Sequence, residues 1–93
     1  MITSFGDKDT ESLFNREWVR KLPLDISSRA RNKLLIINAA TSEIDLSIPP
    51  GNRFERLKGD KKGWCSIRVN DQWRVIFRWA NGNASDVTIT DYH

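Results

Sequence analysis

The stretch that decides the fold runs from residue 64 to residue 79 and reads WCSIRVNDQWRVIFRW. On each side of residues 70–72, apolar residues recur at every second position, which is the period of a strand that buries one face. If the two apolar rows face the same side of the sheet, Val69 lies opposite Trp73. Three residues then form the turn, which is a common loop length in hairpins. The stretch is therefore predicted to be an antiparallel β-hairpin packed against helices.

The same alternation assigns side chains to the two faces of the hairpin. The predicted core face carries Cys65, Ile67, Val69, Trp73, Val75, Phe77 and Trp79. The predicted open face carries Trp64, Ser66, Arg68, Arg74, Ile76 and Arg78. Trp64 is then placed either to stack a nucleic-acid base or to cover a sheet edge.

In this register Arg68 lies directly opposite Arg74. Like charges directly opposite on a sheet are destabilising. An anion between them is the expected reason for the pair, and guanidinium forks suit phosphate oxygens. The competing interpretation is that Glu55, Asp60 or Asp71 neutralises the arginines.

Further short strands are predicted on both sides of the hairpin. They are Phe54–Leu57, followed by a basic turn at Lys58–Gly63, and Ala84–Tyr92, preceded by a turn at residues 81–83. Ile2–Phe5 also alternates and predicts a short first strand.

The first half of the chain is predicted to be helical. Asp7 is a suitable N-cap for a helix whose apolar stripe is Leu13, Phe14 and Trp18, and Pro23 ends that segment. A second helix over 24–40 has Ile26, Ala30, Leu34 and Ile37 on one face. Residues 41–52 are interpreted as a connection. Helices followed by a strand meander predict a single α+β domain over 1–93, with helices on one face of a largely antiparallel sheet.

The charge of the chain is unevenly distributed. Residues 1–50 hold seven acidic and seven basic residues, whereas residues 51–93 hold eight basic and five acidic ones, so the whole net charge of +3 lies in the second half. Such asymmetry indicates an anionic partner, and RNA is the most economical one. The competing interpretation is a solvated face without a ligand.

Other function classes find little support in the sequence. One cysteine and one histidine give no zinc ligand set, and no apolar run approaches the ~20 residues that span a bilayer. There is no glycine-rich phosphate loop and no secretory signal, so a cytoplasmic protein without cofactor, metal or membrane is expected. Cys65 is predicted to pack in the core rather than to act as a nucleophile.

The chain closes on Asp91-Tyr92-His93, which contains its only histidine. Histidine is the side chain that normally titrates near neutral pH, so His93 is a candidate for proton transfer. The competing interpretation is a terminus without a role.

Taken in order, the blocks PPGNRFERLKGDKKGWCSIRVNDQWRVIFRW and DYH, with the opening ITSF and the block NAAT, resemble the HigB toxins. These form the plasmid maintenance killer protein family within the RelE superfamily. The resemblance covers essentially the whole chain. It implies the RelE-like microbial ribonuclease fold, with two N-terminal helices on a small sheet and no metal or organic cofactor.

The resemblance also implies an activity and its partners. HigB-like toxins of type II toxin–antitoxin systems are ribosome-dependent endoribonucleases, which cut mRNA in the 30S A site by attack of a ribose 2′-OH on the adjacent phosphate. A HigA-type helix-turn-helix antitoxin neutralises them, and operator DNA is reached only through the antitoxin complex. The alternative is a non-catalytic RNA- or ribosome-binding blocker of translation that uses the same basic face.

The resemblance assigns roles to individual residues. It makes Lys58, Arg68 and Arg74 the groups that stabilise the phosphate, and Asp91, Tyr92 and His93 the terminal catalytic segment. Some family members have a histidine aligned near Glu55. Here Glu55 and Arg56 occupy that region, so either Glu55 replaces this histidine or the reaction is slower. The remaining predicted RNA contacts are Arg53, Arg56, Lys61, Lys62, Trp64 and Arg78. Replacing Arg68 or Arg74 by alanine is expected to cost activity with little loss of stability.

Overall fold

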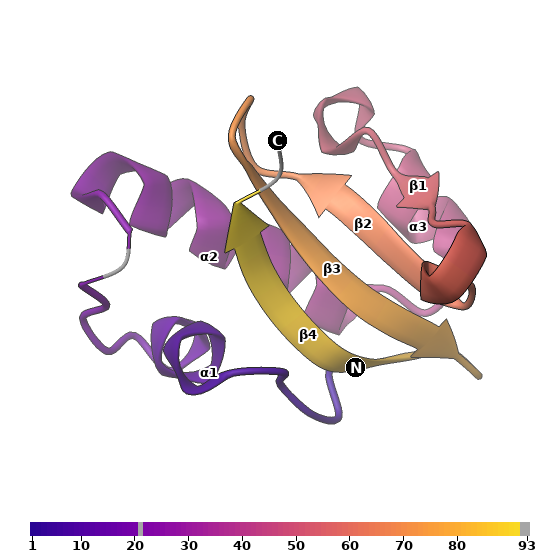
Figure 1. Cartoon of the computed structure of the whole chain (residues 1–93), viewed down its shortest axis with the longest axis horizontal. Coiled ribbons are helices and arrows are strands. Elements are labelled where there is room, and N and C mark those ends of the chain that lie inside the picture. Colours follow the sequence, from indigo (N-terminus) through magenta and orange to yellow (C-terminus); the bar gives the residue numbers. More distant parts are fainter. Residues whose placement is uncertain (21, 92–93) are drawn as a thin grey trace.

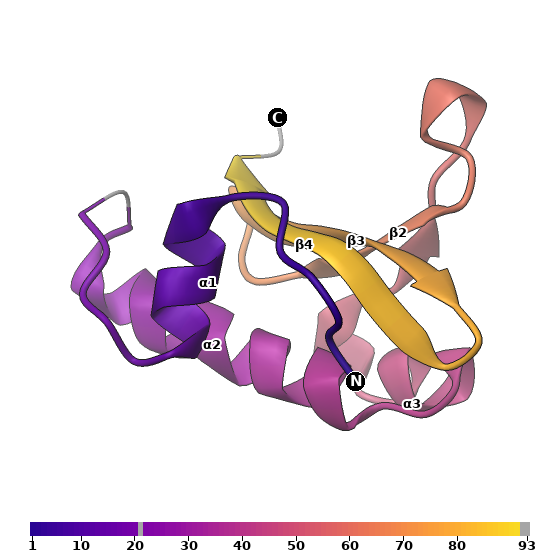
Figure 2. The same cartoon turned by 90° about the horizontal axis from the view of Figure 1, so that it is seen from below.

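The structure is a computed structural model that describes residues 1–20 and 22–91. In these residues, four strands form one antiparallel sheet in the order β1-β2-β3-β4, and three α-helices cover one of its faces (Figure 1, Figure 2). The strands are β1 (Glu55–Arg56), β2 (Trp64–Arg68), β3 (Trp73–Ala80) and β4 (Asn83–Asp91). The helices are α1 (Lys8–Phe14), α2 (Leu24–Ala39) and α3 (Glu43–Ser47). The predicted α+β class is confirmed.

The central hairpin has the predicted register. Arg68 of β2 pairs with Arg74 of β3, and the backbone N–H of Val69 donates to the carbonyl of Trp73 at 2.9 Å. The side chain of Asn70 accepts from the backbone N–H groups of Gln72, at 2.9 Å, and Trp73, at 2.7 Å. These two hydrogen bonds close the turn, so the facing of the arginines is fixed locally.

Two predicted strands are wrong or too long. Residues 2–5 form no strand, since Ile2 and Phe5 make only isolated parallel bridges to Ala84 and Val87 of β4. β1 is limited to Glu55–Arg56, because the chain leaves the sheet at the 3₁₀ turn Gly59–Lys61. The other strand ends lie within one residue of the prediction, and the predicted end at Tyr92 lies outside the described residues.

A bulge interrupts β4. Ile76 pairs with Thr88 and Arg78 pairs with Ser85. Between these two pairs, β4 therefore advances by three residues while β3 advances by two. Asp86 lies inside the bulge with a φ of 52°, in the left-handed region. The bulge restores the alternation beyond it, with Val87 and Ile89 buried and Thr88 and Thr90 on the opposite face.

α1 begins as predicted and ends early. The carboxylate of Asp7 accepts from the backbone N–H of Thr10 at 2.9 Å. After Phe14 the chain turns, and Arg16 adopts a φ of 65°. Trp18 was expected on the apolar stripe of this helix; that prediction is wrong, because its side chain lies beyond the helix and is 70% exposed.

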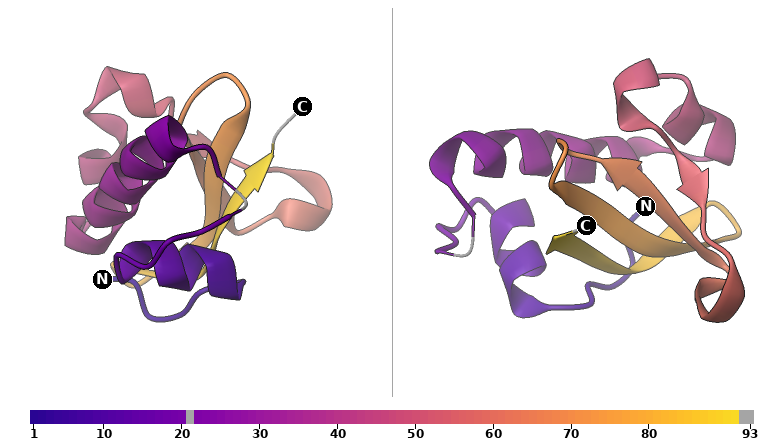
Figure 3. Two further views of the ribbon diagram at one scale, coloured as in Figure 1. Left: turned by 90° about the vertical axis from the view of Figure 1, so that its left-hand side faces the viewer. Right: turned by 45° about the horizontal axis from the view of Figure 1, so that its top comes forward.

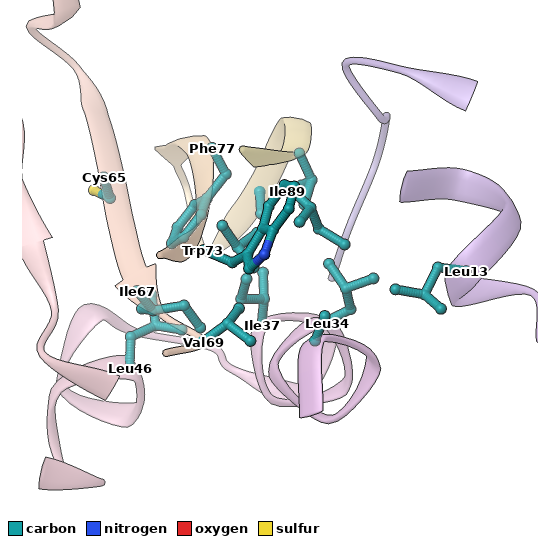
Figure 4. Packing of buried hydrophobic residues seen from close by; sticks show 14 of the residues in the cluster. Leu13, Leu34, Ile37, Leu46, Cys65, Ile67, Val69, Trp73, Phe77 and Ile89 are labelled. Atoms are coloured by element: carbon teal, nitrogen blue, oxygen red, sulfur yellow. The ribbon is translucent and has the colours of Figure 1, made fainter. Parts of the chain in front are cut away.

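α2 is confirmed, while α3 was missed. The predicted face of α2, Ile26, Ala30, Leu34 and Ile37, is buried. Residues 41–52 were interpreted as a connection, yet Ser42 and Asp45 form a capping box that starts α3. Leu46 of α3 is fully buried and fills the core beneath β2, as Figure 4 shows.

The core lies between the sheet and α2. In Figure 4, Trp73 of β3 and Ile89 of β4 approach Leu34 and Ile37 of α2. Trp79, expected in the core with them, is only half-buried at the end of β3. Because the helices cover one face of the sheet, the other face is open, and this open face carries Arg68 and Arg74.

Within the described residues no helix is long and apolar enough to span a membrane.

Candidate nucleic-acid interface and active site

Arg74 is held in a fixed position on the open face. Its side chain is buried, and its Nε donates to the hydroxyl of Ser66 at 3.0 Å. One terminal nitrogen donates to the carbonyl of Arg53 at 2.7 Å, and the other lies 3.5 Å from a carboxylate oxygen of Glu55. The planar guanidinium is therefore oriented before any ligand arrives.

The contact with Arg53 also stabilises an unusual backbone. Arg53 has a φ of 44°, in the left-handed region, which costs a residue with a side chain about 1 kcal/mol. Its carbonyl is the one that accepts from Arg74. Arg74 thus ties the start of β1 to the middle of the sheet.

Arg68 is more accessible than Arg74. Its guanidinium pairs with Asp71 of the hairpin turn, whose side chain is 98% exposed. An ion pair with so exposed a partner contributes about 0–1 kcal/mol. Each arginine of the pair therefore has a carboxylate neighbour, as the competing interpretation required for Glu55 and Asp71, but the one beside Arg68 is easily displaced by a stronger anion.

A hollow of about 360 Å³ lies on the open face next to these arginines. Its lining residues are Leu57, Lys58, Lys61, Ile76 and Thr90. Thr90 is the cross-strand partner of Arg74. The two lysines come from residues 57–63, the basic loop between β1 and β2, which rises from the sheet on the side away from the helices (Figure 2). This open-face hollow, lined by Lys58 and Lys61, therefore lies beside Arg74.

Trp64 also lies on the open face, in contact with cations. The ammonium of Lys61 is 4.9 Å from its ring centroid, and the guanidinium carbon of Arg78 is 5.2 Å away. Arg78 further pairs with Asp86 at 3.6 Å. Trp64 therefore holds two predicted RNA contacts in place by cation–π attraction.

Arg56 lies on the opposite face from the arginine pair. It is the cross-strand partner of Cys65, a core-face residue, and its guanidinium pairs with Glu43 of α3. The two residues of β1 thus point to opposite sides, Glu55 toward Arg74 and Arg56 toward α3. Lys62 is exposed beside this second side of the sheet.

The terminal segment is described only as far as Asp91. This residue is the cross-strand partner of Trp73, so it belongs to the core side of the sheet rather than to the arginine side. Its exposed carboxylate accepts from the side chain of Gln72 at 3.1 Å. Tyr92 and His93 lie outside the described residues.

Cys65 is buried, as expected of a packing residue. Burial is the main cause that raises the pKa of its thiol, to about 11. The thiol is therefore protonated at neutral pH and is a poor nucleophile. Within the described residues no three histidine, cysteine or acidic side chains converge as a metal site would require.

Sequence reasoning missed the partners that fix Arg74. Ser66 was placed on the correct face, but its hydroxyl was not linked to the arginine on the neighbouring strand. The carbonyl of Arg53 could not be predicted as a partner, because every residue has a backbone carbonyl and the residue type does not show which one accepts a hydrogen bond.

Comparison with known proteins identifies the family. A family model described as the RelE-like toxin of type II toxin–antitoxin system HigB matches residues 3–93. The chain belongs to the HigB-like toxin family. The resemblance stated from the sequence is thereby confirmed, and membership implies an antitoxin partner.

Two curated HigB-like relatives span the chain. The Vibrio cholerae protein named Toxin HigB-1 is 48% identical over 94 residues, which is 100% of this chain and 98% of that protein. The Proteus vulgaris protein named Endoribonuclease HigB is 34% identical over 95 residues, covering 100% of both. Among solved structures, a YafQ mutant from Escherichia coli superposes with a TM-score of 0.59 at 18% identity, over 98% of this chain and 91% of that one. This last likeness supports the fold alone.

Proposed function

We propose that this HigB-like toxin is an endoribonuclease that cuts mRNA in the A site of the ribosome. The observation that carries the proposal is the open-face hollow lined by Lys58, Lys61 and Thr90, whose cross-strand partner Arg74 lies opposite Arg68. The name of the Proteus vulgaris relative adds support for the reaction class.

The proposed reaction is attack by a ribose 2′-oxygen on the adjacent phosphorus. The P–O bond to the 5′-oxygen of the next nucleotide breaks, leaving a cyclic phosphate and a 5′-hydroxyl. One group must accept the 2′-OH proton, another must supply a proton to the leaving oxygen, and cations must meet the growing charge on the phosphorane.

In this proposal Arg74, Arg68 and Lys58 supply the cations. Arg74 is already oriented by Ser66 and the Arg53 carbonyl, so its charge needs little reorganisation during the reaction. Because these cations balance the phosphorane charge, the proposed reaction needs no metal ion or organic cofactor.

His93 is the proposed proton-transfer residue. Tyr92 would orient the substrate, and Asp91 would position His93 or move a proton itself. Glu55 is the proposed second proton-transfer group, since its carboxylate is half-exposed on the open face, 3.5 Å from Arg74. Arg53, Arg78 and Trp64 are proposed to hold the RNA around the reacting phosphate.

The proposed partners follow from this reaction. The ribosome would position the mRNA, which makes the free protein a weak nuclease. A HigA-type helix-turn-helix antitoxin would neutralise the toxin. The toxin would reach operator DNA only through its complex with this antitoxin. It would act in the cytoplasm.

A non-catalytic blocker of translation is the second candidate. It is favoured by the three protein contacts of Arg74, which fit a structural arginine as well as a catalytic one. Such a blocker would stall ribosomes on intact mRNA.

A single 2′-deoxy nucleotide in the mRNA separates the two candidates. In a reconstituted translation reaction, the ribosome stalls with that nucleotide at the cut position in its A site. We expect cleavage to stop there and to continue when the deoxy nucleotide is moved three positions away. Cleavage that persists at the deoxy position would contradict 2′-OH attack, and intact mRNA in both cases would favour the blocker.

A further inference from the structure

A second hollow, of about 640 Å³, lies at the β1 edge of the sheet. It extends from α3 to the basic loop, and β1 lies between these two segments in the right-hand view of Figure 3. Its lining residues are Glu43, Arg56, Leu57, Lys58, Gly59, Lys62, Gly63, Trp64, Cys65 and Trp79. None of the roles assigned above uses this edge hollow as a site.

The edge hollow faces away from the arginine pair but borders the open-face hollow. Arg56 and Cys65 share the helix side of the sheet, as their cross-strand pairing requires. Leu57 and Lys58 line both hollows. The two spaces are therefore separated only by the start of the basic loop.

β1 forms the boundary between the two hollows. It is the edge strand of the sheet and only two residues long, and no further strand lies beyond it among residues 1–20 and 22–91. An extended chain bound on the open face can therefore bend around this edge and reach Arg56.

The lining of the edge hollow suits a nucleobase and its phosphate. Arg56, Lys58 and Lys62 bring three cations against one carboxylate, Glu43. Trp79 offers apolar surface, and its ring is held edge-on to Phe77 at 6.3 Å between centroids. The volume lies within the roughly 300–1,000 Å³ typical of small-molecule sites.

We infer that the edge hollow binds one nucleotide of single-stranded RNA next to the phosphate held on the open face. The inference rests on the proposed function. The paired Arg56 and Glu43 present a donor and an acceptor to the polar edge of the base, while Lys62 meets its phosphate. Three cations against one carboxylate favour RNA over a segment of a protein partner.

The test is a ¹H–¹⁵N NMR titration of the full chain with oligoribonucleotides whose 2′-hydroxyls are methylated to prevent cleavage. A dinucleotide carries one phosphate and is expected to shift the amide of Thr90 only. A hexanucleotide of mixed sequence is expected to shift Thr90 and also the indole N–H of Trp79, assigned with Trp79→Phe.

Variants sharpen this titration. Arg56→Ala is expected to weaken hexanucleotide binding about three- to tenfold, the range of one lost hydrogen bond, and to leave dinucleotide binding unchanged. Arg29→Ala, an exposed arginine on α2, is the matched control and is expected to bind both as the wild type does.

Three outcomes would overturn the inference. If saturating hexanucleotide moves Thr90 but not Trp79, the open-face site stands and the edge hollow is no RNA site. If neither residue moves, the inference fails together with the proposed RNA-binding face. If Trp79 responds to an antitoxin but not to RNA, the hollow belongs to a protein partner.

Discussion

At the residue scale, Arg68 and Arg74 form a matched pair with different surroundings. They lie opposite each other in the sheet, but Arg74 is buried with three directed contacts, whereas Arg68 pairs with the exposed Asp71 of the hairpin turn. From sequence both were expected to be replaceable at little cost in stability. The contacts of Arg74 revise that expectation for one of the two.

We therefore expect Arg74→Ala to lower the free energy of unfolding by about 1–3 kcal/mol, because it leaves the Ser66 hydroxyl and the Arg53 carbonyl without this partner. Arg68→Ala should change it by less than about 1 kcal/mol. Urea denaturation followed by tryptophan fluorescence measures both values. Equal stability of the two variants would contradict the anchoring role of Arg74.

At the element scale, the elements with strong apolar periodicity could be predicted from the sequence, whereas short or irregular elements could not. The hairpin register and the buried face of α2 followed from apolar spacing alone, and so did the opposition of Arg68 and Arg74. α3 was missed because five residues are too few to show a helical period. The bulge at Asp86 was missed because a non-glycine residue in the left-handed region has no distinct sequence pattern.

In the candidate site, too, some residues could be placed from the sequence and others could not. Alternation placed Arg68, Arg74 and Trp64 on the open face correctly. It could not reveal that Arg56 turns toward Glu43, because that depends on where α3 packs. Charge counts alone had joined Arg56 to the open face.

The start of α3 gives a prediction on pH. The backbone N–H of Thr41 is the main cause that holds the pKa of Asp45 below its usual value of 3.8, and the Thr41 hydroxyl and Ser42 N–H add to it. A lowered pKa means that this stabilisation is complete above about pH 4 to 5 and is lost as pH falls through the folded value.

We expect the amides of residues 41–43 to move together with the Asp45 carboxyl when pH is lowered from 6 to 2 in an NMR titration. In Asp45→Asn that shared transition should vanish. A midpoint for Asp45 at or above 3.8 would contradict the cap.

At the scale of the whole molecule, the helices and the basic loop lie on opposite sides of the sheet. The helices bury one face of the sheet, and the basic loop rises on the other side, beside the arginine pair (Figure 2). The chain's positive excess is therefore concentrated around the open face and the β1 edge. Binding to RNA should depend on salt through the phosphates that these cations meet.

We expect the double variant Lys61→Glu, Lys62→Glu to bind ribosomes more weakly and with a shallower dependence on salt, since fewer counterions are released. The matched control reverses two exposed charges on the helices, Lys8→Glu with Arg29→Glu, and changes net charge equally. If both double variants lose the same affinity, net charge rather than the basic loop governs binding.

The central claim is that the open face and the terminal segment form one ribosome-dependent nuclease site. Its most direct test is mapping of mRNA 5′ ends after incubation with translating ribosomes, for the wild type and for a chain that ends at Tyr92. The account predicts cuts at defined codon positions with the wild type, only when ribosomes are present, and none with the shortened chain, whose circular dichroism and melting temperature stay unchanged. Cutting by the shortened chain would contradict the role of His93, and stalled translation on intact mRNA with the wild type would contradict the nuclease itself.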